Sequence, residues 1–120
     1  MTPSAHWPEP ALIFEPEPLD GPVVVLVSYR VEPAQETGFF EAMAALGRSR
    51  QRTGASQWQL FRSGEHAGTF VEAFIVRSWE EHLRQHHTRL TGHDLLVEET
   101  VRRFTVGEPT SQHLIAAKTH

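Results

Sequence analysis

The 120-residue sequence contains no cysteine. This absence excludes disulfide frameworks, thiolate nucleophiles and cysteine-based zinc or iron–sulfur sites. Long hydrophobic runs are also missing, because the longest aliphatic run is Val23–Val27, far short of the ~20 residues of a membrane span. The N-terminus has no basic segment followed by an apolar one, so it does not predict a secretory signal. We therefore expect a soluble, cytoplasmic chain that does not insert into the membrane.

Basic charge is scarce as well. The formal net charge is −4, and residues 1–20 account for it with four acids and no Lys or Arg. The rest of the chain balances acids against bases, which argues against a nucleic-acid partner. Most of the eight prolines lie within residues 1–22, and proline fixes φ and removes a backbone donor. We therefore expect an extended acidic arm over residues 1–20 and one folded domain over residues 21–118.

Hydrophobic periodicity predicts the elements of that domain. In chain order they are a strand over Val23–Val31, a helix over Ala34–Arg52, strands over Ser56–Arg62 and Thr69–Arg77, a helix over Trp79–Leu90, a helix that Asp94 begins as N-cap after the break at Thr91-Gly92, and a strand over His113–Ala117. This β-α-β-β-α-β order predicts a ferredoxin-like α+β fold, with helices on one face of a four-stranded antiparallel sheet.

The strands are apolar on both faces. Val23, Val25 and Val27 share one face of the first strand, whereas Val24 and Leu26 lie on the other. A sheet buried on one side only would not need this pattern, and a lone domain would expose a large apolar patch. We therefore predict a homodimer whose two sheets close face to face into a dimeric α/β barrel.

Histidine is concentrated in the segment SWEEHLRQHHTRLTGHD (78–94). On a helix, Trp79, Leu83, His86 and Leu90 form the inner stripe, which places His82 at its border. His82 and His86 have the i, i+4 spacing of metal ligands, but no third ligand is evident, so we expect no metal. His86 is then either a hydrogen-bonded residue between helix and sheet, or an acid or base in a small-molecule pocket.

Other polar and aromatic residues leave alternatives open. Glu72 lies in mid-strand on the face of Phe70 and Phe74, where an unpaired carboxylate is costly. It is either a functional group that lines the barrel, or an ion-pair partner of one of three arginines: Arg30, Arg62 or Arg77.

Three arginines, Arg48, Arg50 and Arg52, crowd the end of the first helix. They could hold an anionic ligand or a lipid headgroup, although the helix dipole favours cations there in any case. Trp58 and Trp79 are either core residues or aromatic walls of a ligand cavity.

Five segments resemble a known family: HWPEP (6–10), GPVVVLVSYRVEP (21–33), RSRQRTGASQWQLFR (48–62), FVEAFIVRSWEEHLRQH (70–86) and HLIAA (113–117). They resemble the soluble C-terminal domain of a bacterial branch of the major facilitator superfamily, the drug and siderophore exporters called transmembrane secretion effectors. The resemblance implies that HWPEP is a tether following a membrane helix. It also implies a membrane transporter as a partner, whereas transport itself does not follow because the membrane helices are missing here.

A broader resemblance is to the antibiotic-biosynthesis-monooxygenase-like dimeric α/β barrels, which share the element order and a Trp followed by a His, matching Trp79 and His86. Members include cofactor-free oxygenases and haem-degrading enzymes, and the resemblance implies that both activities depend on an asparagine near the cavity. This sequence contains no asparagine.

Two functions follow. The first is a dimerisation module that binds a small hydrophobic or anionic molecule in the barrel, without a cofactor. The second is a cofactor-independent monooxygenase for a polycyclic or phenolic substrate, with His86 and Glu72 moving protons and Trp58 packing the rings. Further ligand-binding candidates are Arg62, Phe74, Trp79 and His82. The missing asparagine favours the first function.

Overall fold

The structure, a computed structural model, describes residues 12–87 and 92–119. Its elements are β1 (Val23–Arg30), a short 3₁₀ helix η1 (Pro33–Gln35), α1 (Glu36–Arg52), β2 (Ser56–Arg62), β3 (Thr69–Val76), α2 (Trp79–His87), α3 (Gly92–Arg102) and β4 (Thr110–Ile115). The predicted order of elements is confirmed. None of the described helices is both long and apolar enough to cross a membrane.

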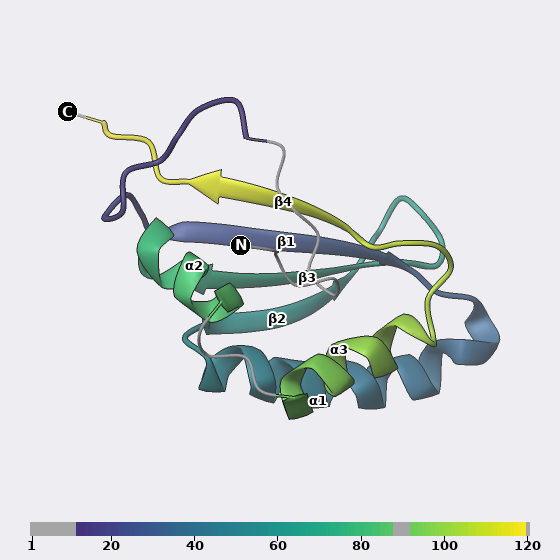
Figure 1. The fold of residues 1–120 in the computed structure, drawn as a ribbon. Coiled ribbons are helices and arrows are strands. Elements are labelled where there is room, and N and C mark those ends of the chain that lie inside the picture. The colour runs from purple at the N-terminus through teal and green to yellow at the C-terminus, as the bar shows by residue number, and fades with distance from the viewer. Residues whose placement is uncertain (1–11, 88–91, 120) are drawn as a thin grey trace.

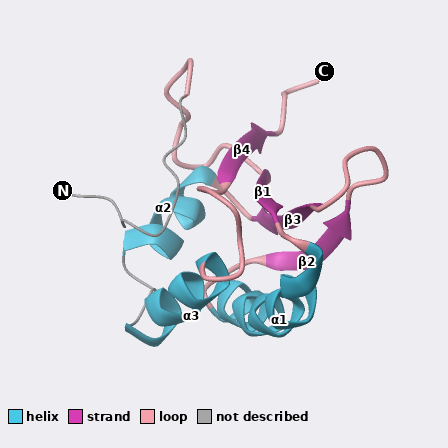
Figure 2. Cartoon of the chain, turned by 90° about the vertical axis from the view of Figure 1, so that its right-hand side faces the viewer, coloured by secondary structure: helices cyan, strands magenta, loops and turns pink. Residues whose placement is uncertain are grey.

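The four strands form one antiparallel sheet in the order β2-β3-β1-β4 (Figure 1). Val25 at the centre pairs with Phe74 on one side and His113 on the other. Figure 2 shows α1, α2 and α3 on the same side of this sheet. The predicted α+β, ferredoxin-like architecture is therefore confirmed.

Alternation along β1 and β3 creates the core. The odd-numbered residues of β1 and the even-numbered residues of β3 are buried toward the helices. Helix α1 contributes Phe39, Met43 and Leu46, which are at most 1% exposed. Their spacing of three to four residues keeps them on one helix face. The helix also lies close to the sheet, because a Cβ on Gly47 would come within 3.0 Å of the Trp58 ring.

Helix α2 is rotated relative to the prediction. Leu83, expected on the inner stripe, is 40% exposed, whereas His82 and Gln85 are at most 1% exposed. The buried Gln85 amide donates to the carbonyl of Arg50 and to the hydroxyl of Thr53. Polar residues can face inward here because α1 supplies partners for them. Leu90 and the side chain of His86 lie outside the described part of the chain.

Two predicted boundaries are also corrected. Helix α3 begins at Gly92, so Asp94 lies inside its first turn instead of capping it. The Asp94 carboxylate is fully buried and accepts a hydrogen bond from the hydroxyl of Ser49 on α1. The last strand begins at Thr110, three residues earlier than predicted.

The C-terminal part of the predicted arm contacts the domain. The backbone carbonyls of Asp20 and Pro18 accept hydrogen bonds from the N–H groups of Trp79 and Glu80. These N–H groups lie in the first turn of α2, where no carbonyl of the helix itself is placed to accept from them. The arm therefore supplies the missing acceptors. Residues 1–11, including the predicted HWPEP tether, lie outside the described residues.

Candidate functional site

A buried carboxylate lies between the sheet and α1. Glu72 on β3 is 0% exposed. Its two oxygens accept hydrogen bonds from the hydroxyl of Tyr29 at 2.7 Å, the indole N–H of Trp58 at 2.8 Å, and Nε and Nη2 of Arg50 at 2.8 and 3.2 Å. The donors come from β1, β2 and α1. The carboxylate is therefore supplied with donors from three sides.

These contacts determine the charge states. Burial alone would raise the pKa of Glu72, but the charge of Arg50 and the hydrogen bonds from Arg50, Trp58 and Tyr29 outweigh it and lower that pKa. Burial, followed by the charge of Glu72, raises the pKa of Tyr29 well above its ordinary value. At neutral pH Glu72 is therefore ionised and Tyr29 protonated. A carboxylate with a lowered pKa and occupied lone pairs is a poor proton acceptor.

Arg50 connects this carboxylate to a second one on α3. Its Nη1 donates to Oε1 of Glu98 at 3.2 Å, and Glu98 is 5% exposed. Burial, opposed in part by Arg50, raises the pKa of Glu98 from 4.5 to about 7. Its other oxygen, Oε2, is buried and has no hydrogen-bond partner in residues 12–87 and 92–119. Glu98 is therefore the group of this cluster that exchanges a proton near neutral pH.

The adjoining cavity is small. It has a volume of about 20 Å³ and is lined by Tyr29, Arg50 and Glu98 together with apolar residues of β1, α1 and α3. This is roughly the space that a single water needs, and far below the ~300 Å³ of a pocket for a drug-sized ligand. The cluster as built does not accommodate a polycyclic substrate.

The cluster contains part of the predicted site and corrects one pairing. Glu72, Trp58 and Phe74 lie together, with the guanidinium of Arg50 5.1 Å from the Phe74 ring centroid. None of the three arginines considered as partners of Glu72 pairs with it, since Arg50 takes that place. Arg62 instead lies 4.8 Å from the Phe70 ring centroid and pairs with Glu36.

Of the two alternatives left open for Glu72, the structure shows the ion pair, because Glu72 pairs with Arg50 of α1. The side chains of Trp58, Glu72 and Phe74 lie on the helix-covered face of the sheet. These side chains therefore lie between the sheet and the helices.

Other candidates form a separate aromatic cluster where α2 meets β4. The rings of Trp79, His82 and His113 lie with centroids 4.8–6.3 Å apart. Burial lowers the pKa of His113, and neither of its buried ring nitrogens has a hydrogen-bond partner among the described residues. The side chain of His86 lies outside the described part of the chain. Where the structure is described, no group of three or more metal-ligating side chains occurs.

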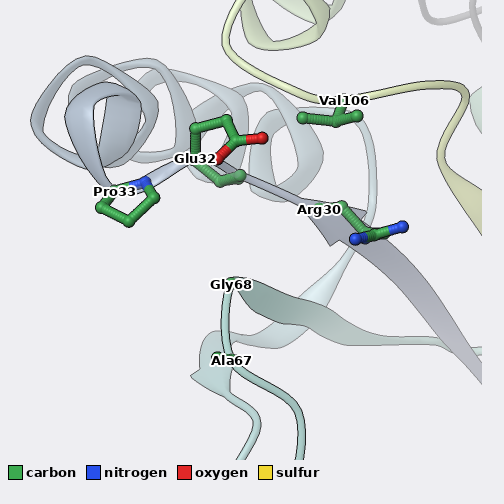
Figure 3. Close-up of a pocket in the computed structure, with 7 residues that line it drawn as sticks. Arg30, Glu32, Pro33, Ala67, Gly68 and Val106 are labelled. Carbon is green, nitrogen blue, oxygen red and sulfur yellow. The ribbon is translucent and has the colours of Figure 1, made fainter.

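A larger, open cavity of about 220 Å³ lies at the end of β1, away from both clusters (Figure 3). It is lined by Arg30, Glu32 and Pro33 on one side and by Ala67, Gly68 and Val106 on the others. Gly68 has φ +75°, and its carbonyl accepts the N–H of Val31 at 2.8 Å. Its lining contains none of the predicted catalytic or ligand-binding residues.

Sequence reasoning missed Tyr29 and Glu98 and assigned Arg50 only to the helix end. A signal was present for two of them. Arg50 continues the buried stripe of α1, four residues after Leu46, and Glu98 lies next to Val97 and three residues before Val101. A charged residue on the apolar stripe of each of two neighbouring helices indicates a buried ion pair between them.

Comparison with known proteins assigns the family. The family model described as "Transmembrane secretion effector" matches residues 1–120. The chain belongs to this family. No curated protein matches it.

Several solved structures share the fold of this transmembrane secretion effector domain. A candidate antibiotic biosynthesis monooxygenase from Caulobacter crescentus CB15 superposes with a TM-score of 0.71 at 18% identity, over 84% of this chain and 94% of that one. SnoaB, a cofactor-independent oxygenase from Streptomyces nogalater, solved as a variant with one asparagine replaced by alanine, gives 0.60 at 16% identity over 82% and 93%. Rv0793 from Mycobacterium tuberculosis gives 0.66 at 18% over 82% and 98%. At these identities the likeness is one of fold.

Replacing Glu72 tests how strongly the fold depends on this carboxylate. Glu72→Gln leaves the guanidinium of Arg50, which is 5% exposed, without its main counter-charge, so we expect a loss of about 3–5 kcal/mol in the free energy of unfolding. Glu36→Gln, which breaks the more exposed pair with Arg62, should cost at most about 1 kcal/mol. Urea denaturation measures both, and equal stability of the two variants would contradict the assigned role.

The raised pKa of Glu98 predicts a pH dependence of stability. Between pH 4.5 and about 7 the unfolded chain loses this proton while the folded protein keeps it, so ionisable Glu98 lowers the free energy of unfolding as pH rises. Glu98→Gln cannot ionise. It should therefore gain about 1–3 kcal/mol relative to the wild type between about pH 5 and pH 8.

Urea denaturation of both proteins at the two pH values measures this difference. The lowered pKa of Glu72 acts in the opposite direction and at lower pH, since its contribution is lost as pH falls below 4.5. This contribution of Glu72 is the same in the wild type and in Glu98→Gln, so it cancels from the difference between their free energies of unfolding. A pH-independent difference between Glu98→Gln and the wild type would show that Glu98 titrates normally.

Proposed function

We propose that this domain is a homodimerisation module of the transmembrane secretion effector family, in which two sheets pack face to face. The observation that carries the proposal is the outer face of the sheet, opposite the helices (Figure 2). Seven apolar side chains lie on it: Val24, Leu26, Phe61, Val71, Ala73, Ile75 and Leu114. None of them is fully buried, and Phe61 and Leu114 are 53% and 45% exposed.

Contiguous apolar surface of this kind is typical of interaction sites, since monomeric proteins rarely expose it. A second copy is the occupant that the family resemblance favours, because the dimeric α/β barrels pair through this face of the sheet. The paired sheets would hold a small hydrophobic molecule between them, where the walls are aliphatic and the charged residues of the helix side are excluded. Association with a membrane transporter is a further part of this proposal.

An enzymatic function is the second candidate. It is favoured by the fold shared with SnoaB and by Glu98, whose pKa of about 7 suits a proton carrier beside Tyr29. Three observations argue against it. The sequence has no asparagine, Glu72 is saturated with hydrogen bonds, and the adjoining cavity of about 20 Å³ has no room for a polycycle.

The dimer is tested with two neighbouring residues of β1 that face opposite ways. Leu26→Asp places a charge on the outer face and should give a folded monomer. Val25→Asp places the same charge on the helix side, at a residue that is 0% exposed, and should prevent folding. Sedimentation velocity at micromolar concentration, with circular dichroism as the folding control, should give about twice 13.6 kDa for the wild type.

A monomeric wild type, or a Leu26→Asp variant that still dimerises, would refute the proposed interface. Either result would leave the buried cluster unaffected, because that cluster lies on the other side of the sheet.

The enzyme is tested by oxygen consumption with an anthrone-type substrate. If the domain is a binding module, the purified protein should consume oxygen no faster than buffer does. Turnover that disappears in Glu98→Gln, with the dimer and the melting temperature retained, would instead establish the second candidate.

A further inference from the structure

A cationic cavity lies on the helix layer, at the junction of α1 and α3. Its volume is about 200 Å³, and its lining residues are Ala45, Arg48, Ser49, Arg52, His93 and Asp94. It faces away from the outer sheet surface that we assign to dimerisation, so it stays accessible in a dimer. The volume is below the ~300 Å³ at which drug-sized pockets begin. A small ion or headgroup is therefore the size of ligand that fits.

Of the two arginines that line this cavity, one is paired with a carboxylate and the other pairs with none that the structure describes. Arg52 pairs with the buried carboxylate of Asp94, which the hydroxyl of Ser49 also holds at 2.7 Å. Arg48 lies one helical turn before Arg52 and is exposed, and it makes no hydrogen bond or ion pair with residues 12–87 and 92–119. His93 likewise has no such partner within the described part of the chain. One guanidinium charge is thus left over beside an ion pair that is fixed in place.

We propose that this cavity binds a phosphate group. A guanidinium presents a planar fork of donors that matches an oxyanion, and a second guanidinium and an imidazole add donors from other directions. A phosphate has enough oxygens to accept from all three groups at once, whereas a carboxylate has only two. The ion pair of Arg52 with Asp94 holds that arginine in position and limits the net charge of the wall, which suits a singly or doubly charged ligand.

The phosphate can come from solution or from a phospholipid headgroup, and the experiment separates these sources. In one arm, inorganic phosphate and pyrophosphate are titrated into the ¹⁵N-labelled full chain. In the other, the chain is sedimented with vesicles of phosphatidylglycerol or of phosphatidylcholine. We expect chemical-shift changes centred on Ala45, Arg48 and His93 in the first arm, or retention by phosphatidylglycerol vesicles in the second.

The decisive comparison is between Arg48→Gln and Arg103→Gln. Both remove one exposed arginine that has no hydrogen-bond or ion-pair partner among the residues the structure describes, but only Arg48 lines the cavity. Arg48→Gln should weaken binding by about tenfold or more, and Arg103→Gln by less than about twofold. Both variants should keep the melting temperature of the wild type, because neither residue is buried.

Saturable binding of free phosphate that depends on Arg48 supports a soluble ligand. Vesicle binding that depends on Arg48, without binding of free phosphate, supports a headgroup. The proposal is wrong if neither arm shows binding, or if the two variants weaken it equally, since equal weakening would reflect general attraction to a cation.

Discussion

The hydrogen-bonded carboxylate of Glu72 holds the sheet and the helices in one arrangement. It joins Tyr29 on β1, Trp58 on β2 and Arg50 on α1, and a buried carboxylate without such donors would be very costly. Arg50 continues the connection to Glu98 on α3, and its backbone carbonyl accepts a hydrogen bond from α2. All three α-helices are therefore linked through one arginine to one carboxylate. A buried ion pair adds little net stability compared with an apolar core, but it penalises arrangements that separate its members.

This constraint separates the structural role from the functional ones. Glu72 has its lone pairs occupied and its pKa lowered, so it cannot hold the helices in place and also exchange protons at neutral pH. The proton-exchanging group is Glu98, at the edge of the network, where one oxygen lacks a donor among the described residues. The opposite face of the sheet carries no comparable network, and its surface is mainly aliphatic and aromatic. The buried polar network and the apolar outer surface thus lie on opposite sides of the same strands.

The elements and the faces of the strands could be predicted from sequence because they depend on local alternation. Each odd-numbered residue of β1 has to be apolar if one face is buried, and that pattern is visible without tertiary knowledge. The rotation of α2 could not be predicted in the same way. Its inner face includes His82 and Gln85, and the Gln85 amide is acceptable there only because α1 presents the Arg50 carbonyl and the Thr53 hydroxyl to it. Likewise, the predicted partners of Glu72 lie on the strands, whereas its actual partner, Arg50, lies on the inner stripe of a helix 22 residues away.

The same packing decides where a ligand can bind. The space between sheet and helices is filled by apolar side chains and by the hydrogen-bonded network around Glu72, and the cavity that remains there measures only about 20 Å³. The larger cavities, of about 220 and 200 Å³, open at the periphery, one at the end of β1 and one between α1 and α3. A fold shared with oxygenases at under 20% identity therefore does not bring their chemistry with it. Enlarging the interior would require moving Arg50 or Glu98, and moving either would leave a charge or a polar group buried without its partner. The space that remains for a ligand consequently lies on surfaces that the ion-pair network does not occupy: the two peripheral cavities, and the outer face of the sheet where we propose dimerisation.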